Sequence, residues 1–153
     1  YKFVLMNDDM YIMEPITYIP YYIKWTLQEH IDYIKEKHWD TKYSEVINRV
    51  YKKYKNWLAF TVHCPIIYNK QKLKELLDTI WDEEISIRSL YGNMYNVPYE
   101  KYSDSDISDC KVYFTDRKYN TGKFLSSNDD AIKNLMFMKH INTKFPSKCK
   151  YEI

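Results

Sequence analysis

Apolar residues spaced by three and four positions dominate the first third of the chain after a short start, and this spacing is typical of amphipathic helices. One such pattern covers residues 20–38, where Pro20 suits the first helical turn. A second covers residues 42–56, with lysines away from its apolar stripe. The two patterns predict two consecutive helices. Their apolar positions are Ile23, Leu27, Ile31 and Ile34 in the first, and Val46, Ile47, Val50, Tyr51, Tyr54 and Trp57 in the second.

From Trp57 onward the apolar spacing changes from helical to alternating, which predicts a β-strand over residues 57–64. This strand contains a histidine next to a cysteine, His63 and Cys64. Side chains that are neighbours along a strand project to opposite faces, so these two cannot act on each other as nucleophile and base. We therefore expect a buried, unreactive thiol and an inward or edge histidine.

The remaining segments alternate between strand and helix signals. Asn69 is a good N-cap for a helix over 70–81, and Ser127 or Asn128 caps another within 126–141. Strands are predicted at 85–91 and 148–153, and a hairpin at 110–125. We expect residues 95–109 to form the main exposed loop, and the segment "MYIMEPITYIP" near the start to be a strand or a packed arm.

The predicted order over residues 57–153 is strand, helix, strand, hairpin, helix, strand. This order resembles the split βαβ, or ferredoxin-like, arrangement, in which helices cover one face of an antiparallel sheet. The expected fold class is therefore α+β, in one domain of residues 1–153, with residues 1–56 as an N-terminal arm and helical pair. The resemblance implies no activity, because this fold carries many unrelated functions.

Composition adds information about the gene and excludes some classes of function. The chain has two alanines, two glycines and three arginines against 17 tyrosines, so residues with GC-rich codons are scarce. This bias favours an AT-rich source genome, such as that of a phage, a large DNA virus, a low-GC bacterium or a protist, and we expect a phage or virus. The formal net charge is only +2, far from the basic character of a dedicated nucleic-acid binder.

Cysteine usage and hydropathy indicate where the protein resides. The three cysteines are widely spaced, which favours reduced thiols over a disulfide framework or a zinc site. No apolar run is long enough to span a bilayer, and no signal peptide is visible. We therefore expect an intracellular protein, in a host cytoplasm or a virion, with no membrane partner. We also expect no metal and no cofactor, because phosphate-binding glycine loops and metal-ligand spacings are missing.

The preferred hypothesis is a non-enzymatic binding or assembly protein that acts through protein–protein contacts or self-association. The segment "MYIMEPITYIPYYIKW", residues 10–25, which we call the arm, is rich in tyrosine and methionine and is punctuated by prolines. Such residues suit interfaces. The predicted contact residues are Tyr11, Tyr18, Tyr21, Tyr22 and Trp25.

Two alternatives remain open at this stage. The first is a nucleic-acid-binding module on the basic and aromatic end of the second helix, where aromatic rings would stack on bases and lysines would meet phosphates. Its residues are Tyr51, Lys52, Lys53, Tyr54, Lys55 and Trp57. The second alternative is an enzyme whose site includes His63 and the acidic loop from Asp104 to Asp109.

Overall fold

The computed structural model describes residues 1–7, 9–38, 42–53, 56–80, 86–102, 107–109 and 122–147. The chain divides into two compact units. Unit 1 comprises Tyr1–Leu5, Tyr18–Val62 and Ile66–Tyr102, and unit 2 comprises Met6–Thr17, His63–Pro65 and Ser103–Ile153. Helices and short strands occur in both, which confirms the α+β class. That the whole chain forms one domain stays a prediction.

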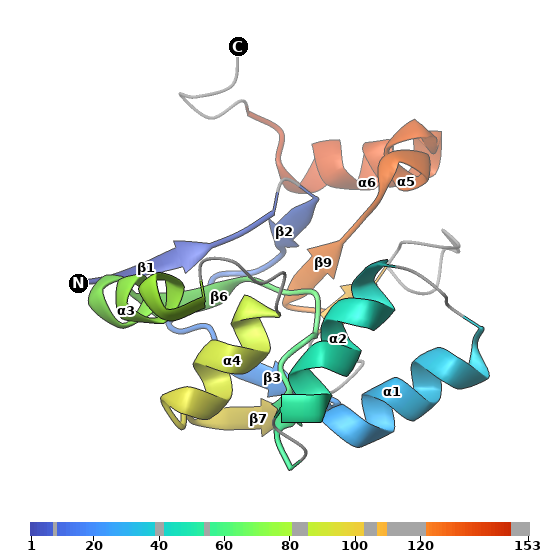
Figure 1. The fold of residues 1–153 in the computed structure, drawn as a ribbon. Coiled ribbons are helices and arrows are strands. Elements are labelled where there is room, and N and C mark those ends of the chain that lie inside the picture. The colour runs from blue at the N-terminus through green and yellow to red at the C-terminus, as the bar shows by residue number, and fades with distance from the viewer. Residues whose placement is uncertain are drawn as a thin grey trace. The chain divides into compact units, whose positions relative to one another are not determined.

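Unit 1 contains four helices and three small two-stranded sheets among its described residues (Figure 1). Strands β1 (Lys2–Leu5) and β6 (Ile66–Asn69) pair antiparallel, as do β4 (Trp25–Thr26) and β5 (Leu58–Ala59). Strands β3 (Tyr21–Ile23) and β7 (Tyr99–Lys101) pair in parallel. The helices are α1 (Leu27–Glu36), α2 (Lys42–Lys53), α3 (Lys70–Ile80) and α4 (Ile87–Met94).

The first helix begins later than the apolar spacing predicts. The prediction of a helix from residue 20 was wrong, because residues 21–23 and 25–26 are strands and α1 begins after Thr26. Thr26 and Glu29 form a capping box: the Thr26 hydroxyl accepts from Glu29 N, and the Glu29 carboxylate accepts from Thr26 N. The Thr26 backbone N–H and the Thr26 hydroxyl both donate to the Glu29 carboxylate, and these two bonds lower the pKa of Glu29. The threonine-to-glutamate spacing thus fixes the start of the helix.

The helix predicted over 42–56 is confirmed over Lys42–Lys53 as α2, while residues 54 and 55 lie outside the described residues and residue 56 is in a turn. The predicted N-cap at Asn69 is confirmed for α3. The Asn69 Oδ1 atom accepts from Gln71 N at 3.0 Å and from Lys72 N at 3.2 Å. Each of these helices contributes one buried residue to an apolar cluster of unit 1. One cluster contains Leu27, Ile31, Ile34, Ile47 and Ala59, and the other contains Ile66, Tyr68, Leu76, Leu90 and Tyr91.

The strand predicted at 85–91 was wrong, since residues 87–94 form α4. The reason lies in how α4 bonds to residues 58–62. The Asn93 side chain accepts from Leu58 N and donates to Leu58 O, both at 2.9 Å, and the Ser89 hydroxyl accepts from Phe60 N at 3.1 Å. Arg88 Nη1 donates to Val62 O at 2.9 Å. Side chains of α4 therefore form hydrogen bonds with backbone groups of residues 58–62 that would otherwise pair with a neighbouring strand.

Replacing Asn93 with alanine should lower the free energy of unfolding by about 2 kcal/mol, because Leu58 N–H and C=O lose the groups that pair with them in a partly buried site. Urea denaturation would measure this loss, and amide hydrogen exchange at Leu58 should accelerate with it. Asn142→Ala, at an exposed helical position, is the control and should change stability by less than about 0.5 kcal/mol. Equal stability of the two variants would contradict this role of Asn93.

Unit 2 contains strands β2 (Met10–Ile12), β8 (Ile107–Asp109) and β9 (Phe124–Ser126), with β9 in the centre. Its helices are α5 (Asp129–Lys133) and α6 (Leu135–Lys144). The cap at Asn128 is confirmed, because its side chain accepts from Ala131 N. The prediction of one helix was wrong: Asn134 is extended and its side chain caps α6. Phe137, Leu125 and Met13 belong to the core of this unit.

The predicted ferredoxin-like arrangement has to be corrected. No ferredoxin-like sheet is evident among the residues that the structure describes, where most sheets have only two strands. The predicted strand at 57–64 shortens to Leu58–Ala59, and the chain bends at His63 and Cys64. Most of the predicted hairpin and the final strand lie outside the described residues. None of the described helices is long and apolar enough to cross a membrane, and the intracellular location stays a prediction.

Candidate functional site

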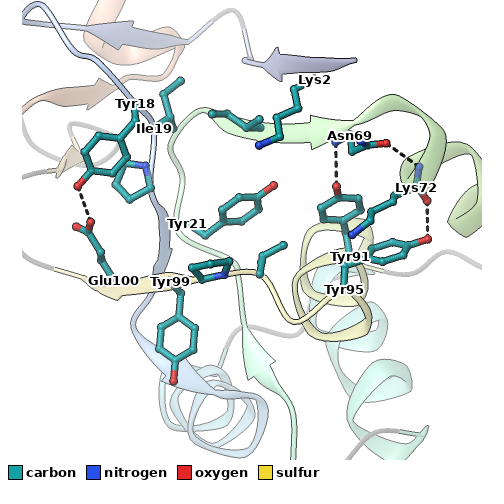
Figure 2. Close-up of a pocket in the computed structure, with 14 residues that line it drawn as sticks. Lys2, Tyr18, Ile19, Tyr21, Asn69, Lys72, Tyr91, Tyr95, Tyr99 and Glu100 are labelled. Atoms are coloured by element: carbon teal, nitrogen blue, oxygen red, sulfur yellow. Dashed lines mark hydrogen bonds between the residues drawn. The ribbon is translucent and has the colours of Figure 1, made fainter.

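A pocket of about 530 Å³ lies within unit 1, and we call it the tyrosine pocket (Figure 2). Its size falls in the range of pockets that bind small molecules or peptide side chains. Five tyrosines and two prolines form much of its wall: Tyr18, Tyr21, Tyr91, Tyr95, Tyr99, Pro20 and Pro98. Ile19, Ile67 and Val97 add aliphatic surface, and Lys2, Asn69, Lys72 and Glu100 add polar groups.

The pocket lies where the two parallel strands begin. An aliphatic residue, a proline and a tyrosine occur in this order at residues 19–21 and again at 97–99. Proline has no backbone N–H to give to a ladder, so strands commonly begin directly after it. Tyr21 and Tyr99 are paired in register as the first residues of β3 and β7. The repeated pattern therefore places two prolines and two tyrosines at one end of the strand pair.

Three of the five tyrosine hydroxyls are held by neighbours in the pocket wall (Figure 2). Tyr18 OH donates to Glu100 Oε1 at 2.7 Å, and Tyr95 OH donates to Lys72 O at 2.7 Å. Tyr91 OH accepts from Asn69 N at 2.9 Å. The bonds of Tyr91 and Tyr95 tie the ends of β6, α3 and α4 together, and the bond of Tyr18 joins the arm to β7. All three fix the orientation of the rings.

The Tyr21 hydroxyl differs from those three. Among the described residues, no group accepts a hydrogen bond from it, and Figure 2 shows its ring across the middle of the pocket. Burial raises the pKa of Tyr21, and the nearby Tyr91 and Tyr68 hydroxyls raise it further. Burial likewise raises the pKa of Tyr68 to about 12. The Tyr21 hydroxyl is therefore protonated at neutral pH and is available as a hydrogen-bond donor to a ligand.

Phe60 packs against two of the tyrosines that line the pocket. Its ring meets the rings of Tyr21 and Tyr99 edge-on, each at a centroid distance of 6.2 Å. Phe60 is itself buried, and its backbone N–H is bonded to Ser89 of α4. The positions of two pocket tyrosines thus depend on the packing between residues 58–62 and α4.

Of the five contact residues predicted on the arm, the pocket includes Tyr18 and Tyr21. Tyr18 is 63% exposed. Tyr22 is buried in unit 1, and Trp25 stacks on His30 and Tyr33. Tyr11 packs against Phe137 in unit 2. The arm is therefore divided between the units, since residues 6–17 belong to unit 2.

The alternative nucleic-acid site is only partly described. Lys52 and Lys53 are exposed at the end of α2. Trp57, which would have to stack on a base, packs instead against both apolar clusters of unit 1. Tyr54 and Lys55 lie outside the described residues, and nothing is described of the Tyr51 side chain. The position of Trp57 favours a structural role for its ring, and nucleic-acid binding at this helix end stays a prediction.

His63, the centre of the enzyme alternative, lies among polar residues of unit 2. Its Nδ1 atom is 2.6 Å from Ser126 Oγ, and its Nε2 atom is 3.7 Å from Asp9 Oδ2 and 3.2 Å from Asn7 Nδ2. Serine, histidine and aspartate are the residue types of a hydrolase triad. Ser126, however, is completely buried, so a substrate could not reach its hydroxyl. Of the predicted acidic loop, only 107–109 is described, as β8.

Cys64 is buried and is not in a disulfide. Among the described residues, no three side chains of His, Cys, Asp or Glu gather closely enough to hold a metal ion. Cys110 and Cys149 lie outside those residues.

The chain matches no protein-family model, no curated protein and no solved structure, so its function has to be inferred from the tyrosine pocket and its surroundings.

Proposed function

We propose that this chain is a non-enzymatic binding protein that takes up an extended segment of a protein partner in the tyrosine pocket. The observation that carries the proposal is the pocket itself, where aromatic walls surround a Tyr21 hydroxyl that no described residue engages. Tyrosine supplies large contact area and a polar tip at little conformational cost, which is why it is enriched at protein interfaces. The AT-rich codon bias favours a phage or virus as the source.

The wall of the pocket is held in place before any ligand binds. The hydroxyl bonds of Tyr18 and Tyr95 and the bond to Tyr91 fix three rings. The β3–β7 pairing fixes the backbone of Tyr21 and Tyr99. A site whose side chains are already ordered loses less conformational entropy on binding than a flexible one. This order supports recognition of a defined segment.

A selection from a library of random peptides would test this function. Peptides selected on the immobilised protein should bind about tenfold or more weakly to Val97→Trp, because a bulky indole at this half-buried wall position would fill the pocket. The matched control is Met94→Trp, at a position that is 49% exposed on α4 and outside the pocket wall. It should bind the same peptides as the original protein does.

Thermal denaturation of both variants would show that each is folded. The proposal fails if no peptides are enriched, or if the enriched peptides bind Val97→Trp and Met94→Trp equally well. In either case the tyrosine pocket would not be the surface at which a peptide binds.

A further inference from the structure

We infer that the segment bound by the tyrosine pocket is rich in proline, adopts the polyproline II conformation and carries a carboxylate beside its prolines. This inference rests on the proposed function and adds the chemistry of the ligand. Three properties of the pocket lead to it: the arrangement of the rings, the unused Tyr21 hydroxyl and the position of the lysines.

Ring surface is offered by the exposed Tyr18 and Tyr99 and by the half-buried Tyr21 and Tyr95. The buried Tyr91 contacts the last two rings and holds them at fixed angles. The Tyr21 and Tyr91 rings are parallel within 9° at a centroid distance of 6.5 Å, and Tyr95 is tilted against Tyr91 at 4.9 Å. Proline rings pack against aromatic faces, and a polyproline II segment is already ordered before it binds. Grooves lined by aromatic residues accordingly bind such segments with a small loss of conformational entropy.

The hydrogen-bonding groups of the pocket match a ligand that accepts bonds. Tyr21 OH has no acceptor among the described residues. Tyr91 OH, in contrast, accepts from Asn69 N and belongs to a residue that is only 3% exposed. A polyproline II segment makes no internal hydrogen bonds, and its prolines carry C=O groups without N–H. Its carbonyl groups can therefore accept from the Tyr21 hydroxyl.

The charges of the pocket favour an acidic residue on the ligand. Lys2 and Lys72 both line the pocket, and among the described residues neither has a carboxylate within ion-pair distance. Lys72 Nζ lies over the Tyr95 ring, 4.8 Å from its centroid. The acidic group of the wall, Glu100, already accepts from Tyr18. Figure 2 shows Glu100 beside Tyr18 and Lys72 beside Tyr95. A ligand carboxylate therefore fits the end of the pocket at Lys72.

Three fluorescently labelled peptides of about ten residues would test the ligand chemistry by fluorescence anisotropy. The first contains proline pairs followed by two glutamates, the second replaces the prolines with alanine, and the third replaces the glutamates with lysine. The second and third should each bind about tenfold more weakly than the first. The preference for glutamate over lysine should shrink as salt is added.

Two variants with the same chemical change identify the hydroxyl that binds. Tyr21→Phe should weaken binding of the first peptide about fivefold, since one hydrogen bond is lost. Tyr1→Phe is the matched control, because Tyr1 is 81% exposed and does not line the tyrosine pocket. It should leave the affinity unchanged within about twofold. Lys72→Glu should reverse the preference, so that the lysine peptide binds more tightly than the glutamate peptide.

The outcomes of these experiments distinguish this inference from the proposed peptide-binding function on which it rests. If the proline-free peptide binds as tightly as the first, the polyproline inference is overturned and the peptide-binding function stands. If none of the three peptides binds, the inference is overturned, and the random-library selection decides the function: peptides that need an open pocket uphold it. Binding of a nucleotide mixture in the pocket, with no peptide bound, would overturn both.

Discussion

Replacing Gly92 with alanine is expected to lower the free energy of unfolding by about 3 kcal/mol. A methyl group at this position would overlap Phe60 Cδ2 and Cε2 and would lie 2.8 Å from Phe60 Cγ. Phe60 has little room to move, because it is buried and its ring contacts Tyr21 and Tyr99 on β3 and β7. The cost therefore arises from displacing an aromatic ring within a packed core.

The direction of this effect distinguishes overlap from helix propensity. In an exposed helix, alanine is more stable than glycine by about 1 kcal/mol, so propensity alone predicts that Gly92→Ala stabilises α4. Thermal denaturation should instead show a melting temperature lower by about 6 to 12 °C. Met94→Ala, at an exposed position of the same helix, is the control and should leave it nearly unchanged. An unchanged or raised melting temperature for Gly92→Ala would contradict the close contact.

Acidification is expected to destabilise the protein through His30, by about 3 kcal/mol between neutral pH and pH 4. His30 is 4% exposed and stacks on Trp25 at a centroid distance of 5.0 Å. Burial lowers the pKa of His30 to about 4 from its ordinary value of 6.5. The unfolded chain therefore takes up a proton below pH 6.5 that the folded protein resists until about pH 4. Stability is full above pH 6.5 and is lost as the pH falls to 4.

Urea denaturation at a series of pH values would measure this effect. His30→Gln removes the titrating group, so stability of the variant should fall less between pH 6.5 and pH 4, by about 3 kcal/mol, than stability of the original protein. Carboxylates titrate in both proteins, and comparison of the two curves cancels their contribution. Parallel curves would show that His30 is not a source of acid sensitivity.

Local signals in the sequence predict those elements whose ends are marked by capping residues. The helices α2, α3 and α5 follow from apolar spacing and from the asparagine caps at 69 and 128. The start of α1 was missed although Thr26 and Glu29 have the spacing of a capping box. Residues 85–91 alternate like a strand, and only contacts with the distant residues 58–62 explain the helix.

The tyrosine pocket could be predicted only in part. The arm suggests Tyr18 and Tyr21, but Tyr91, Tyr95 and Tyr99 come from segments that the sequence presents as a strand and a loop. The one signal that could have joined them is the repeat of aliphatic residue, proline and tyrosine at 19–21 and 97–99. Pairing of β3 with β7 brings the repeats together, and short-range patterns contain no information about that pairing.

The bonds between α4 and residues 58–62 also bear on solubility during folding. The segment "WLAFTV", residues 57–62, is uncharged, apolar and β-prone, and such segments associate with one another when their edges are open. Strand β4 pairs with one edge of this segment at Leu58–Ala59. Side chains of Asn93, Ser89 and Arg88 bond backbone groups that β4 leaves unpaired. A chain in which α4 has not yet docked presents this edge to other molecules. Aggregation should therefore be the first defect of variants that weaken α4.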